Sequence, residues 1–314
     1  MFLYFSKRVL GIFPTLIVIS FAVFMIINLI PGDPASIIAG PSASAEQVAA
    51  LSIKFGLDKP LLTRYFIWLQ HLLRGDLGVT VISGKPVLTL LAERIPATLE
   101  LALVATVLSV LIALPLGILS ALRPNRIVDT LGTAFSALFF ALPPFWLAIL
   151  FMLLFCVLWP LLPPSGRPSF VDSPWLHLKS LWLPALTLAL GMAAISVRYV
   201  RSALLEALGQ EYVLAARAKG LPESVVLRRH ALRNALIAVV TILGLQLGDL
   251  LGGTLIIESL FAWPGVGRLV IQAIAWRDYG LLQAAVLYLL LAFMLVTLVV
   301  DLLTGLLDPR VRYR

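Results

Sequence analysis

A short polar interval organises this sequence, and it reads Gln210-Glu211-Tyr212-Val213-Leu214-Ala215-Ala216-Arg217-Ala218-Lys219-Gly220-Leu221-Pro222. Apolar stretches lie on both sides of it, at 181–199 and 235–257. Each is close to the length of about 20 residues that a helix needs to cross the hydrocarbon core of a membrane. The alanines favour helix, Gly220 suits a left-handed helix end, and Pro222 suits the start of a second helix. The interval therefore predicts a short exposed helix with a smooth face, held between two membrane spans.

The composition is that of a membrane protein. Of the 314 residues, 61% are hydrophobic and 13% are charged, and the mean hydropathy is +1.01. A soluble domain is usually about a quarter charged. The net charge of +8 does not indicate nucleic-acid binding, because the basic residues cluster at the ends of the apolar stretches, as they do in membrane proteins.

Six apolar stretches predict an all-α polytopic membrane protein with about six transmembrane helices. They are 9–30, 97–122, 131–159, 181–199, 235–257 and 281–307. The third contains Pro143-Pro144, which predicts a kink, and the fourth is the shortest. The first exceeds the apolar core of a secretory signal peptide, about 7–15 residues, so we expect an uncleaved first span.

An even number of spans places both termini on one side of the membrane. Most of the Lys and Arg residues then fall on that same side, which predicts that both termini are cytoplasmic. The sequence divides into an N-terminal tail with the first span, 1–30, an outer subdomain, 31–96, and a five-helix core, 97–314. The core contains the cytoplasmic loop 200–234.

The segment 31–96 is too long for a simple connector. Apolar residues at helical spacing predict an amphipathic helix over 61–72, and Gly75-Asp76-Leu77-Gly78 predicts a turn. Two roles are open for this subdomain: a cap that stabilises the bundle, or a landing surface for a soluble partner.

No catalytic, cofactor or metal site is expected. The three histidines, His71, His177 and His230, lack metal-ligand spacing, and Cys156 is the single cysteine. The sequence contains no Gly-x4-Gly-Lys-Ser/Thr phosphate loop. Any nucleotide hydrolysis must therefore take place on another polypeptide.

Polar residues inside apolar stretches are the candidates for a transport pathway, because they are costly in a membrane. Asp249 lies in the fifth stretch, one turn after Gln246 and close to glycines. It either lines a pathway that attracts a cationic group or pairs with a second membrane subunit. Glu258 is expected near the outer mouth, where it can pair with Arg268. Asp301 and Glu100 are expected to be structural.

The stretch after the fifth span predicts a tight turn, Trp263-Pro264-Gly265-Val266-Gly267, followed by a helix with an apolar face. Trp263 and Trp276 suit a membrane–water interface. The turn is either an aromatic anchor or part of an outer gate.

The interval 211–222, with His230-Ala231-Leu232-Arg233-Asn234-Ala235, resembles the EAA coupling loop of ATP-binding-cassette importer permeases, in the form found in the dipeptide/oligopeptide/nickel permease family. The resemblance covers nearly the whole chain and points to the family's first permease subunit. Its other matching stretches are Arg8, Ile30-Pro31-Gly32-Asp33-Pro34, Gly56-Leu57-Asp58-Lys59-Pro60, Gly75-Asp76-Leu77-Gly78, Pro96-Ala97-Thr98-Leu99-Glu100, Phe261-Ala262-Trp263-Pro264-Gly265-Val266-Gly267-Arg268 and Asp308-Pro309-Arg310. Leu214 stands where the general motif has a glutamate, so it cannot supply that residue's salt bridge; the peptide branch commonly lacks the glutamate.

The resemblance implies a type I importer permease fold in the bacterial inner membrane. It implies a pathway formed with a second homologous permease, two cytoplasmic ATPases that drive it, and an extracytoplasmic protein that delivers substrate. The ATPase-coupling residues would be Glu211, Tyr212, Ala215, Ala216, Arg217, Ala218, Lys219, Gly220 and Leu221. The pathway residues would be Gln246, Asp249 and Glu258.

The expected substrates are dipeptides and oligopeptides, with nickel, a metal chelate or glutathione as alternatives. An acidic residue at Asp249 favours a substrate with a cationic part. A different class, an intramembrane enzyme, would require Asp249 and Asp301 to act as a catalytic pair, and the flanking sequence gives that no support.

Overall fold

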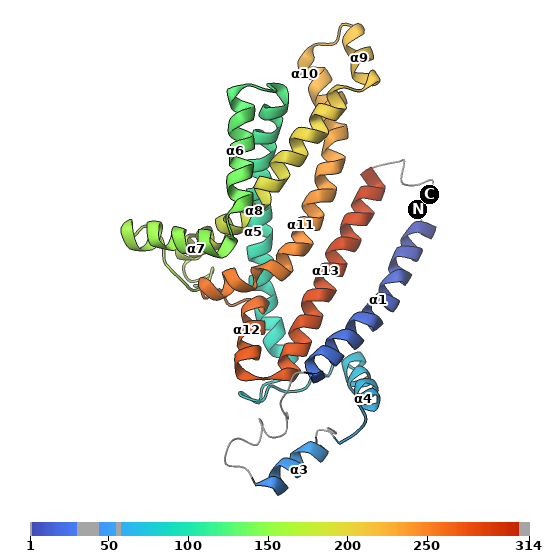
Figure 1. Cartoon of the computed structure of the whole chain (residues 1–314), viewed down its shortest axis with the longest axis vertical. Coiled ribbons are helices and arrows are strands. Elements are labelled where there is room, and N and C mark those ends of the chain that lie inside the picture. Colours follow the sequence, from blue (N-terminus) through green and yellow to red (C-terminus); the bar gives the residue numbers. More distant parts are fainter. Residues whose placement is uncertain (1, 30–43, 55–57, 308–314) are drawn as a thin grey trace.

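The computed structural model describes residues 2–29, 44–54 and 58–307 (Figure 1). These residues form helices, turns and one isolated bridge between Val79 and Pro86. The helices are α1 (Phe2–Leu29), α3 (Ala45–Lys54), α4 (Leu61–Leu73), α5 (Val87–Leu122), α6 (Ile127–Ala141), α7 (Pro144–Met152), α8 (Pro174–Leu208), α9 (Glu211–Ala218), α10 (Glu223–Val225), α11 (Leu232–Leu260), α12 (Val266–Trp276) and α13 (Tyr279–Leu307), with π-helical turns η1 (Leu153–Leu158) and η2 (Val226–Ala231).

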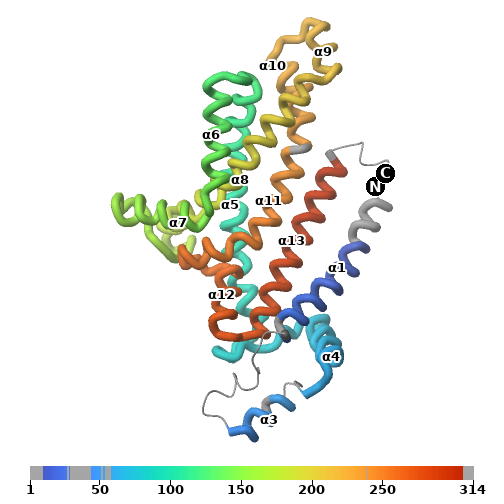
Figure 2. Tube along the Cα trace, in the orientation of Figure 1, coloured from blue at the N-terminus to red at the C-terminus, as the bar shows by residue number. Residues whose placement is uncertain are grey.

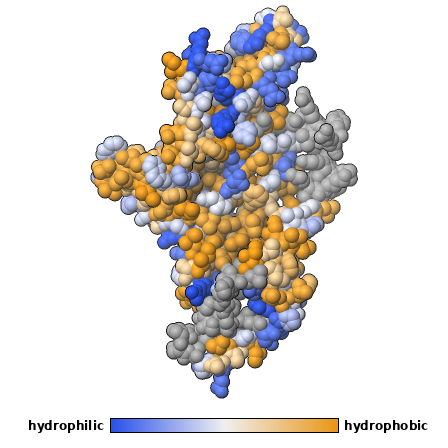
Figure 3. Space-filling view, in the orientation of Figure 1, coloured by the Kyte–Doolittle hydropathy of each residue, from blue (hydrophilic) through white to orange (hydrophobic). Residues whose placement is uncertain are grey.

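The long helices run side by side between two ends of the molecule (Figures 1 and 2). One end carries α9 and α10 and is called here the α9 end; the other carries α4 and α12 and is called the α12 end. Apolar side chains dominate the middle of the face shown in Figure 3, and hydrophilic side chains gather over α9 and α10. This arrangement is that of a bundle that crosses a membrane.

Four helices among the described residues are long and apolar enough to cross a membrane: Val87–Leu122, Pro174–Leu208, Glu223–Leu260 and Tyr279–Leu306. A fifth candidate is the pair Ile127–Ala141 and Pro144–Leu158, which is bent by 97°. Helix α1 contributes a shorter apolar part, Leu10–Ile26. Together these correspond in order to the six predicted stretches.

The kink predicted at Pro143-Pro144 is confirmed, and it is a sharp break. Pro143 is extended, and Pro144 occupies the first turn of α7, where its missing N–H costs no hydrogen bond. The residue before a proline is also disfavoured in helical conformation. Helix α7 therefore leaves the bundle sideways (Figure 1).

The prediction for the fourth span was wrong in length. Helix α8 has 35 residues, and 78% of its apolar window is buried, against 6% for α13. Helices α5, α6, α7 and α11 all pack on it. Helix α8 is therefore the central helix of the bundle, although its sequence predicted the shortest span. The second span also starts earlier than expected, at Val87.

Helix α5 lies very close to α8. A Cβ atom added to Gly117 would lie 2.6 Å from the Cβ of Val200, so only glycine permits this approach. Small residues allow such close backbone packing in membrane helices.

The amphipathic helix predicted in the outer segment is confirmed as α4. Its Tyr65 is buried against Phe21 and Phe24 of α1, and the Tyr65 and Ser20 hydroxyls lie 2.9 Å apart. The turn that follows is also confirmed, with Gly75 and Gly78 both at positive φ. Helix α4 thus packs on the α12 end of α1.

Candidate coupling and pathway sites

Helix α9 stands at the tip of the α9 end and is anchored by one face. Val213 and Ala216 are buried. They join a cluster of apolar side chains from α5, α8, α9, η2 and α11, made of Ala121, Leu204, Ala207, Val213, Ala216, Val226, Ala231 and Ala235. Gly220 ends the helix at φ +75°, as the sequence predicted. The short helix is therefore fixed to the bundle, and its orientation follows that of α8 and α11.

The opposite face of α9 is open. The exposed coupling candidates are Glu211, Tyr212, Ala215, Arg217, Ala218, Lys219, Gly220 and Leu221. Leu214, at the position of the general motif's glutamate, is 56% exposed. Ala216 is the exception among the nine candidates, because it faces the cluster described above and presents no surface to a partner.

An ion pair closes the loop after α9. The Arg217 guanidinium donates two hydrogen bonds to the Glu223 carboxylate, at 2.6 and 3.1 Å. These bonds raise the pKa of Arg217 from its usual value. The pair spans Gly220 and Pro222, so it holds α9 against the start of α10.

From Pro222 the chain runs through α10 and the π-helical turn η2 directly into α11. Arg228 and Arg229 on η2 are exposed. Residues Glu223–Leu260 therefore form one continuous helical path from the loop after α9 into the fifth span.

Two of the three pathway candidates lie together on α11. Ser196 of α8 donates a 3.2 Å hydrogen bond to the Gln246 side-chain oxygen, and the Gln246 amide nitrogen is buried without a partner among the described residues. Asp249 lies one turn further along α11, and it is exposed in the single subunit. Space is open beside Gly252 and Gly253. Leu245, Asp249, Gly252 and Ile256 thus form an uncovered stripe at helical spacing.

The third candidate, Glu258, is enclosed. Thr98 of α5 donates to one carboxylate oxygen at 2.8 Å, and the Arg268 backbone N–H donates to the other at 2.9 Å. The expected pairing with the Arg268 guanidinium is wrong, because that group donates instead to the Ala262 carbonyl at 2.7 Å. The Glu258 side chain is therefore buried within this subunit. Its hydrogen bonds link α11 to α5 and α12.

The expectation that Trp263 lies at a membrane interface is also wrong. Trp263 is fully buried, and its indole N–H donates to the Ala97 carbonyl of α5 at 2.8 Å. Trp276, at the end of α12, is 42% exposed, as an interfacial residue would be. The turn between α11 and α12 is therefore fixed to α5 by its aromatic residue.

Several charged residues gain partners that the sequence did not indicate. Glu100 accepts hydrogen bonds from Arg167 and His177, in keeping with its expected structural role. Asp278, which the sequence did not single out, accepts the Val81 and Leu281 backbone N–H groups at 2.8 and 3.0 Å. Its position just before an apolar run was the one available signal, that of a helix N-cap.

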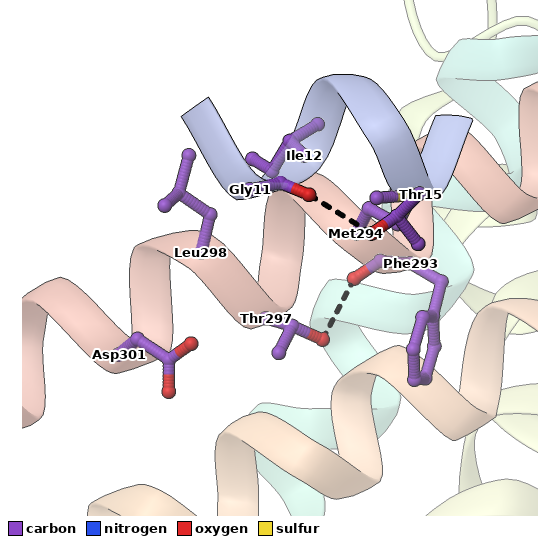
Figure 4. Close-up of a pocket in the computed structure, with 8 residues that line it drawn as sticks. All are labelled: Gly11, Ile12, Thr15, Phe293, Met294, Thr297, Leu298 and Asp301. Atoms are coloured by element: carbon purple, nitrogen blue, oxygen red, sulfur yellow. Dashed lines mark hydrogen bonds between the residues drawn. The ribbon is translucent and has the colours of Figure 1, made fainter. Parts of the chain in front are cut away.

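A groove of about 300 Å³ lies between α1 and α13 (Figure 4). Its lining is mostly apolar, with Thr15, Thr297 and Asp301 as polar members. The Thr15 and Thr297 hydroxyls donate to backbone carbonyls of their own helices, at 2.9 Å each. Asp301 lies at the edge of this groove, on a different helix from Asp249.

Comparison with known proteins identifies the family of this chain. Residues 113–313 match the family model "Binding-protein-dependent transport system inner membrane component", and residues 1–102 match the model of its N-terminal part. The chain belongs to this family. It is a permease subunit of an ATP-binding-cassette importer.

Curated relatives match the permease along its whole length. The glutathione transport system permease protein GsiC of Salmonella paratyphi A is 40% identical over 311 residues, covering 99% of both chains. The protein of the same name in Escherichia coli K12 is 38% identical with the same coverage. These relatives place the permease in the oligopeptide/dipeptide branch that its motifs resemble.

Solved structures support the fold. An inward-facing structure of the MetNI methionine ABC transporter aligns with a TM-score of 0.55 at 20% identity, covering 70% of the permease and 96% of that chain. An amino acid ABC transporter structure aligns with a TM-score of 0.50 at 16% identity. The helical bundle is therefore that of importer permeases.

Proposed function

We propose that this permease imports short peptides, with glutathione as the first compound to test, and that Asp249 and Gln246 line the route. The observation that carries the proposal is the exposed Asp249 carboxylate, set on α11 beside the open space at Gly252 and Gly253. Relatives named for glutathione transport, at 38–40% identity over the whole chain, support the choice of substrate class.

The chemistry of such substrates fits a carboxylate in the pathway. A peptide carries an α-ammonium group, and glutathione carries one as well. A carboxylate in a membrane interior is costly unless it faces water or a cation. In the proposal, Asp249 faces the space enclosed with a second permease, where it pairs with the substrate ammonium during passage.

The exposed face of α9 is proposed to dock on a cytoplasmic ATPase subunit. Tyr212, Leu214 and Leu221 supply apolar contact, and Arg217 and Lys219 supply charge at the rim. Val213 and Ala216 anchor the helix, so a push on α9 reaches α8 and α11 through packed side chains. ATP hydrolysis is assigned to the partner subunits, since the sequence lacks a phosphate loop.

The α9 end is proposed to be cytoplasmic, with both termini on that side. Arg228, Arg229 and Arg233 lie at this end, in agreement with the preference of Lys and Arg for the cytoplasmic side. The α12 end is then extracytoplasmic and receives the substrate-binding protein.

The test is transport in proteoliposomes by the complete complex, assembled with its binding protein, second permease and ATPases. Uptake of radiolabelled glutathione, a dipeptide, an oligopeptide and nickel is compared. We expect ATP-dependent uptake of glutathione or a peptide. Uptake of nickel alone would contradict the proposed substrate class, and ATP hydrolysis by the isolated permease above background would contradict the assignment to partner subunits.

A further inference from the structure

A compact group of side chains at the α12 end joins three parts of the chain that are far apart in sequence, residues 97–100, 167–177 and 258–263. We call it the outer joint, and it consists of Ala97, Thr98 and Glu100 of α5, Arg167 and Pro168 of the segment 159–173, His177 of α8, Glu258 of α11 and Trp263 of the following turn. Trp263 lies at its centre. Its N–H donates to the Ala97 carbonyl, the Arg167 guanidinium lies 5.6 Å from its ring centre, and the His177 ring meets it edge-on at 6.0 Å.

The Glu100 carboxylate forms one side of the outer joint. The Arg167 guanidinium donates two hydrogen bonds to one of its oxygens, at 2.8 and 2.7 Å. The His177 Nε2 atom bonds the other oxygen, and the His177 Nδ1 atom donates to the Pro168 carbonyl at 2.8 Å. His177 is only 1% exposed. Hydrogen bonds between charged groups are about twice as strong as neutral ones, so this side holds the segment 159–173 firmly.

The Glu258 carboxylate forms the other side. It accepts from the Thr98 hydroxyl, and that hydroxyl accepts the Val266 backbone N–H at 2.8 Å. Because Thr98 and Glu100 lie on the same turn of α5, the two sides share one rigid support. The end of α11, the start of α12 and the segment 159–173 are therefore tied to the same point.

The segment 159–173 is attached at its start to η1, and in its middle to the α11–α12 turn and the outer joint. The Leu161 and Leu162 N–H groups donate to the Phe155 carbonyl of η1 at 3.0 and 3.2 Å, and the Gly166 N–H donates to the Phe261 carbonyl at 2.9 Å. Further along the segment, Arg167 and Pro168 form the hydrogen bonds of the outer joint. Its tip is largely exposed, with Phe170 55% and Val171 88% exposed, and the Phe170 ring meets the His177 ring edge-on at 5.4 Å. A force on the tip is thus delivered to the outer joint and from there to α11.

We propose that the outer joint transmits contact between the delivering binding protein and the segment 159–173 to the pathway helix α11, with Trp263 and Glu100 as positioning residues. The proposal rests on the proposed function, because it takes the α12 end as extracytoplasmic. A contiguous chain of hydrogen bonds and packed rings is the physical basis for coupling between two sites. The signal is the arrival of the loaded binding protein, and the response is ATP hydrolysis at the α9 end.

The experiment compares ATP hydrolysis by the complete complex with and without the loaded binding protein. Trp263→Phe keeps the aromatic ring and removes the N–H, and Glu100→Gln keeps the shape and removes the charge. The matched controls are Trp276→Phe on the exposed end of α12 and Glu93→Gln on the exposed face of α5. Both joint variants should retain assembly and basal hydrolysis, while stimulation falls by about fivefold or more, the lower range of coupling between sites.

Two further readouts separate positioning from general stability. Hydrogen exchange of residues 159–173 in the resting complex should accelerate in Glu100→Gln and remain unchanged in Glu93→Gln. Val171→Asp, which alters only the exposed tip, should lower stimulation without changing hydrogen exchange at Glu100. Wild-type stimulation in Trp263→Phe and Glu100→Gln would overturn the proposal, as would an equal loss of basal and stimulated hydrolysis in both. If the wild-type complex shows neither uptake nor stimulation, the proposed function itself fails.

Discussion

Arg201 of α8 holds both carboxylate oxygens of Asp129 at the start of α6, at 2.6 and 2.8 Å. The same carboxylate accepts the Asn125 backbone N–H at 2.9 Å, where Asn125 adopts a left-handed turn. Seven residues after Arg201, α8 ends beside the loop that carries α9. The pair therefore fixes α8, the helix that leads into α9, to the turn between α5 and α6.

Removing the charge of Asp129 should destabilise the permease. Asp129→Asn keeps the shape but loses the ionic hydrogen bonds to Arg201, and a hydrogen bond to a charged group contributes about 1.5–3 kcal/mol. We expect a lower melting temperature in detergent. Glu206→Gln, at an exposed position on α8, is the control; equal melting temperatures for the two variants would contradict a structural role for the pair.

Adjacent alanines in α9 should respond differently to the same substitution. Ala215 is exposed and Ala216 is buried. Ala215→Glu should leave the bundle intact and weaken recovery of the ATPase subunits in co-purification, because the new charge stands on the docking face. Ala216→Glu should lower the melting temperature as well, because it forces a carboxylate into the apolar cluster. If Ala215→Glu assembles and transports like the wild type, this face does not contact the ATPase.

Substitution of Asp249 tests the pathway. Asp249→Asn should leave assembly and basal ATP hydrolysis intact and reduce uptake at low substrate by about tenfold or more, since the lost interaction with an ammonium is a charged hydrogen bond of about 1.5–3 kcal/mol. Asp58→Asn, at another exposed acid, controls for the loss of charge. If Asp249 pairs with the second permease, assembly fails first. Normal assembly with normal uptake would remove both roles.

Gly265 should tolerate no side chain. A Cβ atom there would overlap the carboxylate of Glu258, so Gly265→Ala must displace either the turn or the carboxylate. Overpacking of this kind costs about 1–3 kcal/mol, and we expect a lower melting temperature. Gly191→Ala on α8 is the matched control, because nothing lies within 4 Å of its added Cβ and alanine favours helix. A melting temperature unchanged in Gly265→Ala would show that the turn yields easily.

Local sequence signals predicted the elements well where the structure depends on neighbours in the chain. Gly220 and Pro222 set the end of α9 and the start of α10, and the paired prolines 143 and 144 set the break between α6 and α7. The sequence did not predict which face of each helix is buried. Ala215 and Ala216 are identical in sequence, and only the packing of Leu204 and Val226 around α9 distinguishes them.

The errors at α8 and Trp263 share a physical cause, namely pairing across long sequence distances. Helix α8 was underestimated because Lys179, His177 and Arg201 interrupt or border its apolar run. The partners of His177 and Arg201, Glu100 and Asp129, lie more than 70 positions earlier in the chain. Trp263 was assigned to an interface because its partner, Ala97, contributes only a backbone carbonyl, which no side-chain pattern reveals.

The central position of α8 has a consequence for biosynthesis. Its apolar window has a mean hydropathy of 1.8, the lowest of the four long spans, against 2.6 for α5 and 2.7 for α13. The acids that receive His177 and Arg201 lie on α5 and α6, which leave the ribosome first. In a chain lacking residues 87–141, we expect α8 to insert into the bilayer less often. The measurement is the accessibility of cysteines engineered on either side of α8. Unchanged insertion would show that α8 does not depend on α5 and α6 already being in the membrane. Helices α5 and α6 are then inserted before α8, and they supply the acidic partners for the charged residues of α8 in the membrane.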